Sequence, residues 1–103
     1  MKDQSEIGWS EEEYVAYLNG ERELFAWCLK KYGSFSVESA REEALSFYEY
    51  EPASAPHRGL VFHDEAWHWA MLKIHGDLYW KKHPELESPS EEYEKEAARL
   101  HNN

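Results

Sequence analysis

The chain has 103 residues, a formal net charge of −10 and a single cysteine. This length fits one domain with a real core and is too short for a cofactor domain joined to a substrate domain. Aromatic residues make up 16% of the chain, which excludes a disordered acidic tail. The negative charge argues against nucleic acid and against an anionic membrane surface, because both require basic residues. It favours a cationic partner, such as a basic protein or a metal.

The first predicted helix begins at Ser10, which forms a capping box with Glu13. The apolar residues that follow share one face at helical spacing: Tyr14, Leu18, Phe25, Cys28, Leu29 and Tyr32. Asn19-Gly20 interrupts the pattern, either as a loop between two helices or as a weak point in one. Because the apolar face keeps its phase across Gly20, we predict one helix with a possible kink that ends at Gly33.

A second helix is predicted from a cap at Ser36 to a stop at Pro52. Its apolar face comprises Val37, Ala40, Ala44, Phe47 and Tyr48. Residues 51–59 contain two prolines and small side chains, which predicts a loop. The next segment, 59–62, has no strand to pair with, so we expect coil that packs Phe62 inward.

A third helix is predicted to open at His63-Asp64. Its apolar face comprises Trp67, Ala70, Met71, Ile74 and Leu78. Gly76-Asp77 either ends this helix or marks a turn within it. Residues 59–83 carry no net charge and are the most aromatic part of the chain. We therefore expect this segment to form the central helix, with residues 64–74 as its most buried part.

A last helix is predicted to start at Ser88-Pro89-Ser90-Glu91. The chain is thus expected to be a single all-α domain, residues 1–103, folded as a bundle of about four helices. We expect residues 1–9 to be flexible and to carry no secretory signal, because they lack an apolar core. No stretch is apolar enough to span a membrane, so the sequence predicts a cytoplasmic protein.

One group of residues resembles part of a metal site. Glu65 and His68 are spaced i, i+3, and Asp64 and His68 are spaced i, i+4, so both pairs would share a helix face. A Glu-x-x-His motif is half of a di-iron carboxylate site, which needs a second such motif. The chain has no second one, so we predict no metal and no cofactor, and interpret the carboxylates as first-turn partners of the helix dipole. A small helical metalloprotein is kept as an alternative.

Nucleophilic catalysis has little support in the sequence. Cys28 is the only thiol, and aromatic residues surround it within a predicted helix, where a thiol is usually buried and inert. No glycine-rich loop for an oxyanion or a phosphate accompanies it. We therefore predict that the protein is not an enzyme and assign no catalytic residue. A single buried thiol also fits a reducing compartment.

A partner-binding site is predicted at the end of the second helix. Tyrosines alternate with carboxylates in Tyr48-Glu49-Tyr50-Glu51-Pro52. One helix face cannot bury both tyrosines, so at least one should be exposed as an anchor, while the carboxylates meet Lys or Arg of a partner. The predicted binding residues are Glu42, Glu43, Tyr48, Glu49, Tyr50 and Glu51. The alternative is that both rings pack on neighbouring helices and the carboxylates only face solvent.

These features together predict a small acidic protein that neutralises a basic partner. The run from Tyr48 to Pro52 resembles the Tyr-Tyr-Pro element of the nuclease-colicin immunity proteins, which are acidic four-helix proteins. A glutamate separates the two tyrosines here. The resemblance implies a role for these tyrosines in inhibiting a nuclease-type toxin by occlusion. An inhibitor that mimics nucleic acid is the alternative, because an acidic surface can also imitate phosphates.

Overall fold

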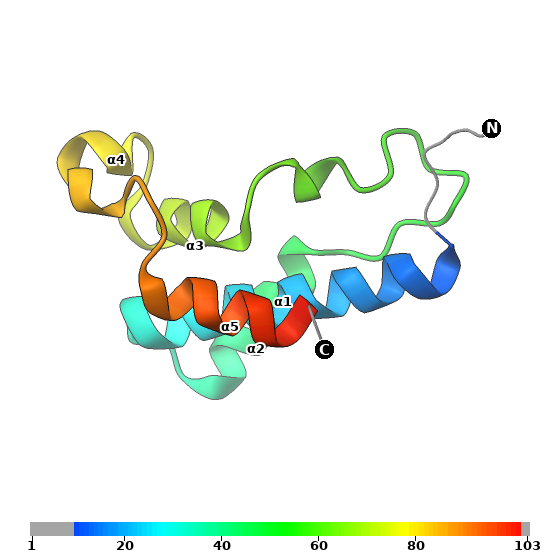
Figure 1. Cartoon of the computed structure of the whole chain (residues 1–103), viewed down its shortest axis with the longest axis horizontal. Coiled ribbons are helices and arrows are strands. Elements are labelled where there is room, and N and C mark those ends of the chain that lie inside the picture. Colours follow the sequence, from blue (N-terminus) through cyan, green and yellow to red (C-terminus); the bar gives the residue numbers. More distant parts are fainter. Residues whose placement is uncertain (1–9, 102–103) are drawn as a thin grey trace.

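The structure is a computed structural model that describes residues 10–101 (Figure 1). In chain order its elements are α1 (Glu11–Gly33), α2 (Val37–Phe47), the 3-10 helix η1 (Leu60–His63), α3 (Ala66–His75), α4 (Tyr79–Lys82), the 3-10 helix η2 (Pro84–Leu86) and α5 (Glu91–His101). These residues contain no strand, which confirms the predicted all-α fold. None of their helices combines the length and the apolar character needed to cross a bilayer. The predicted flexible segment, residues 1–9, lies outside the described part.

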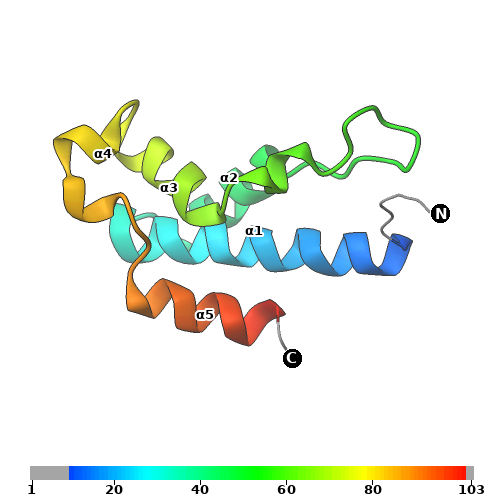
Figure 2. The same cartoon turned by 45° about the horizontal axis from the view of Figure 1, so that its top comes forward.

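The central helix is α1, which contacts α2, α3 and α5. Figure 2 shows α5 alongside one side of α1 and α3 alongside the other. The buried residues of α1 are Tyr14, Leu18, Gly20, Glu21, Leu24, Phe25, Cys28 and Leu29. The expectation that residues 59–83 form the centre is therefore wrong. Net charge is a poor guide here, because the carboxylates of α1 lie mainly in its exposed first turn and leave the rest of the helix free to pack.

The prediction of one continuous first helix is confirmed, and its capping box is present. Ser10 Oγ accepts from the Glu13 amide at 3.1 Å, and Glu13 Oε1 accepts from the Ser10 amide at 3.0 Å. Gly20 lies inside the helix. A glycine suits this position because the side chain of His101 packs very close to it. A Cβ atom there would stand 2.5 Å from Cε1 of His101, the last residue of α5. A methyl group cannot fit at that distance unless His101 moves.

The second helix begins as predicted, with Ser36 Oγ accepting from the Ser39 amide. It ends at Phe47, well before Pro52, which corrects the predicted end. Tertiary contacts account for the early end. Arg22 of α1 donates from Nε to the Tyr48 carbonyl at 2.9 Å, so the carbonyl of the residue after α2 is bound to α1. Residues 48–59, between α2 and η1, form bends and turns and contain no helix.

The third helix also differs from its predicted start. His63 ends η1, Asp64 and Glu65 are extended, and α3 begins at Ala66. Gly76 then ends α3, so the residues after it form the separate short helix α4. Residues 60–63 form the 3-10 helix η1, which corrects the predicted coil. The inward packing of Phe62 is confirmed, because its ring lies 4.8 Å from that of Tyr17, centroid to centroid, and is half-buried.

Candidate functional site

The structure separates the two tyrosines of the predicted binding site. Tyr48 is fully buried, and its ring packs edge-on against Phe25 and Phe47. Burial raises the pKa of the Tyr48 hydroxyl, and the nearby Glu21 carboxylate raises it further. Within residues 10–101 the hydroxyl has no hydrogen-bond partner. Tyr48 is therefore part of the core, and the predicted division into one buried and one exposed tyrosine is observed.

Tyr50 is the exposed tyrosine, with half of its surface accessible. Its hydroxyl donates a hydrogen bond to Glu11 Oε2, and its ring packs edge-on against Tyr14 at 5.6 Å. The hydrogen bond from Tyr50, together with Arg58, lowers the pKa of Glu11, and the same bond raises the pKa of Tyr50. The exposed ring is thus held in one orientation beside an ionised carboxylate.

Arg58 connects this cluster to the loop that follows α2. Its guanidinium lies 3.7 Å from the centre of the Tyr14 ring and binds Glu11 Oε1 at 2.7 Å. Both interactions hold the loop against the first turn of α1. We call Glu11, Glu49, Tyr50 and Arg58 the Tyr50 cluster. Glu11 belongs to it although the sequence places it far from the other three.

The other predicted binding residues have mixed roles. Glu42 and Glu49 are exposed and free to meet a partner. Glu43 binds Lys73 of α3 at 3.0 Å, and Glu51 accepts from the Gly59 amide at 3.0 Å. The predicted site is therefore reduced to its exposed members, because Tyr48, Glu43 and Glu51 serve the fold.

The structure does not assemble the predicted carboxylate–histidine pairs. Asp64 and Glu65 precede α3, so they do not share a helix face with His68. His68 Nδ1 lies 3.0 Å from the Tyr79 hydroxyl instead. Across residues 10–101, no three His, Cys, Asp or Glu side chains are grouped so that they could hold a metal ion. Nothing in this region therefore supports the alternative of a metalloprotein.

Cys28 is buried in α1, as predicted, and forms no disulfide. Burial raises the pKa of its thiol, and the Glu21 carboxylate adds to the effect. The reactive species of a cysteine is the thiolate. A thiol held in its protonated form in the core is a packing residue.

A buried carboxylate–imidazole pair, which the sequence did not predict, joins α1 to α5. Glu21 is 3% exposed, and its Oε2 lies 2.8 Å from His101 Nε2. The His101 ring also stacks on Tyr17, with 4.4 Å between ring centroids. Burial raises the pKa of Glu21, whereas the hydrogen bond from His101 opposes the rise. The pair therefore ties the last residue of α5 to the middle of α1.

The same carboxylate interacts with the N-terminus of α3. Glu65 stands at the N-cap position but makes no side-chain capping bond. The Ala66 backbone, at the first position of the helix, lowers the pKa of Glu21, and the Trp67 amide donates to the Tyr93 hydroxyl at 3.4 Å. The N-terminus of α3 thus interacts with groups from α1 and α5, and the helix dipole favours the negative charge there. Glu21 is the point at which three helices meet.

One signal in the sequence marks Glu21. The apolar face of α1 advances in alternating steps of four and three residues, and Glu21 occupies the step between Leu18 and Phe25. A carboxylate within such a face must be paired, because an unpaired buried charge is costly. The partner, His101, is distant in the sequence and carries no comparable signal.

This geometry predicts the effect of Gly20→Ala. In a helix interior the change normally stabilises by about 0.5–1 kcal/mol. Here we expect a loss of stability in urea unfolding, because the new methyl group displaces His101 and breaks its bond to Glu21. In a His101→Ala background, the same change should become stabilising. A gain in both backgrounds would contradict the close packing.

No protein-family model, no curated protein and no solved structure matches this chain. The fold and the site therefore define its class by themselves. Over residues 10–101 it is a small all-α domain, built around α1, in which a buried carboxylate–imidazole pair joins α1 to α5. Its surface carries the Tyr50 cluster.

Proposed function

We propose that this protein binds and inhibits a cationic protein through the Tyr50 cluster. The partner is a basic toxin domain of the nuclease type, and the protein acts as its immunity protein in the cytoplasm. Inhibition is by occlusion of the partner's active site or substrate groove, and this chain performs no chemistry. The observation that carries the proposal is the half-exposed Tyr50 ring, which is fixed between Glu11 and Tyr14.

Two physical arguments support binding through this face, and one observation bears on the compartment. A tyrosine that is already ordered in the free protein loses little conformational entropy when a partner covers it. Glu42, Glu49 and the other exposed carboxylates create a negative field, which accelerates association with a positive protein. Cys28, a free and buried thiol, is compatible with a reducing compartment.

The test uses the basic partner that co-purifies from the native host, with calorimetry for the affinity and stopped-flow mixing for the rate constants. Tyr50→Ala is expected to weaken binding by more than about 1 kcal/mol, mainly through faster dissociation. Glu42→Gln combined with Glu49→Gln should cost less and slow association instead, with the effect fading as salt rises. Circular dichroism checks that each variant keeps its helices.

Two controls separate this face from the rest of the molecule. Tyr48→Phe removes a hydroxyl from the core and should leave affinity unchanged, because no partner can reach it. Glu91→Gln combined with Glu94→Gln makes the same charge change on α5 and should affect association less. If Tyr50→Ala and the Glu42/Glu49 variant both bind like wild type at low salt, the proposed face is wrong. Turnover of a substrate by the protein alone would overturn the inhibitor role.

A further inference from the structure

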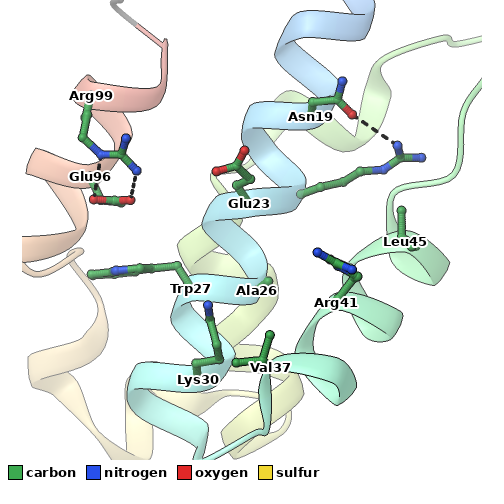
Figure 3. A pocket seen from close by; sticks show the side chains of 12 residues that line it. Asn19, Glu23, Ala26, Trp27, Lys30, Val37, Arg41, Leu45, Glu96 and Arg99 are labelled. Carbon is green, nitrogen blue, oxygen red and sulfur yellow. Dashed lines mark hydrogen bonds and ion pairs between the residues drawn. The ribbon is translucent and has the colours of Figure 1, made fainter.

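A second surface of the molecule has the opposite electrostatic character. It is a groove of about 620 Å³ lined from α1, α2 and α5. Figure 3 shows α1 between α2 and α5 at this site. Its lining on α1 extends from Asn19 to Lys30, which is about 16 Å, or three helical turns. On α2 the lining includes Val37, Arg41 and Leu45, which are spaced one turn apart.

The groove is apolar at positions where a partner could approach closely. The side chains of Ala26 on α1 and Ala44 on α2 are small, so the backbone of a partner helix can approach α1 and α2 closely. Val37 is 63% exposed and Leu45 is 49% exposed, although both are large apolar residues. Burial of these side chains would be favourable by the usual hydrophobic term.

Cations gather in this groove although the chain as a whole is strongly acidic. Arg41 and Lys30 make no ion pair with any carboxylate of residues 10–101, and Figure 3 shows Arg41 reaching from α2 toward α1. Arg22 donates to two neutral oxygens, the Tyr48 carbonyl and Asn19 Oδ1. The lining also contains two carboxylates, Glu23 and Glu96, and Glu96 is bound by Arg99. The four cations of the lining therefore outnumber its carboxylates by two.

We infer that this groove binds an acidic amphipathic helix of another protein. Apolar side chains at i, i+4 and i+7 of that helix would contact Ala26, Val37 and Leu45, as in other helix-in-groove complexes. Its flanking Glu or Asp residues would meet Arg41, Lys30 and Arg22. At physiological salt, charges are screened beyond about 8 Å. The local balance of four cations against two carboxylates, Glu23 and Glu96, therefore decides the charge that a partner meets here.

The shape of the groove favours a helix over a small anionic ligand. A small-molecule pocket encloses most of its ligand's surface. This groove is lined from three helices but is open along its length, so a small amphiphile would stay largely in water.

The inference goes beyond the proposed function, because the face and the sign of the partner's charge both differ. The probe is a stapled peptide about three turns long, with leucines at i, i+4 and i+7 and flanking glutamates. The staple is needed because helices this short are marginal in water. Its affinity is measured by fluorescence anisotropy, against the same peptide with lysine in place of glutamate. We expect the glutamate peptide to bind at least about tenfold more tightly.

Charge reversal in the protein locates the site. Arg41→Glu combined with Lys30→Glu should weaken the glutamate peptide by about tenfold or more and improve the lysine peptide. The control is Lys81→Glu on α4, which changes the net charge by the same amount as Arg41→Glu alone. Of these two single variants, only Arg41→Glu should weaken binding of the glutamate peptide. Both substituted residues are exposed, so the fold should survive.

Three outcomes would overturn the inference. The first is equal binding of the two peptides, and the second is unchanged binding by the Arg41/Lys30 double variant. The third is equal weakening by Lys81→Glu, which would show a general charge effect without a site.

Sedimentation of the protein alone tests whether a second copy of the chain occupies the groove. A dimer that the Arg41/Lys30 variant loses would replace the peptide partner. Competition by a short-chain fatty acid at micromolar concentration would replace it with a small amphiphile.

Discussion

Trp67→Ala is expected to lower the free energy of unfolding by about 3–5 kcal/mol, the usual cost of removing a large aromatic side chain from a core. Trp67 is 2% exposed and packs edge-on against Tyr32 and Tyr93. Its Nε1 donates to the Leu86 carbonyl at 2.9 Å, so the side chain also fastens η2 to α3. Urea unfolding followed by circular dichroism measures the loss.

Two comparisons separate the contributions of Trp67. Trp67→Phe keeps most of the packing but leaves the Leu86 carbonyl without its donor, so we expect a smaller loss, near 1 kcal/mol. Trp80→Ala removes the same type of side chain from a half-buried site on α4 and should cost clearly less than Trp67→Ala. A loss for Trp67→Ala within about 0.5 kcal/mol, as at a surface position, would contradict its place in the core.

His101→Ala is expected to destabilise the protein by about 3 kcal/mol at neutral pH, because it leaves the buried Glu21 carboxylate without its partner. The loss should fall mainly on the docking of α5. A hydrogen-exchange measurement should show faster exchange of the α5 amides than in the wild type, while the amides of α1 change less.

The loss should also depend on pH in a defined direction. Burial raises the pKa of Glu21 above its ordinary value of 4.5. A group with a raised folded-state pKa contributes its full stability below the unfolded-state pKa and loses it as pH rises through the folded-state pKa. Removal of His101 takes away the interaction that opposes this rise. The deficit of His101→Ala should therefore be small near pH 4.5 and grow toward neutral pH.

Two further variants identify Glu21 as the titrating group. Glu21→Gln keeps an acceptor for the Ala66 amide and removes the charge, so combining it with His101→Ala should recover much of the lost stability. Glu23→Gln makes the same charge change at an exposed position on α1 and should not. A deficit that is equal at both pH values, or that persists in the Glu21→Gln background, would show that the pair is not the cause.

The predicted binding site shows how far local reasoning extends. Helical spacing was enough to predict that Tyr48 and Tyr50 could not both be buried. Which of them is exposed depends on where α2 ends, and the contact from Arg22 to the Tyr48 carbonyl accounts for that end. The hydroxyl of the exposed Tyr50 ring then donates a hydrogen bond to Glu11, which lies in the first turn of α1. No local pattern contains that partner.

The sequence by itself determined the all-α class, the continuous α1 and the helix starts at Ser10 and Ser36. These features depend on capping residues and apolar spacing, which act within a few residues along the chain. Tertiary structure decided which helix is central, the early end of α2, and the pairing of Glu21 with His101. The physical reason is that burial and pairing energies depend on neighbours brought together only by the packed helices, as Gly20 shows by giving His101 the space to reach Glu21.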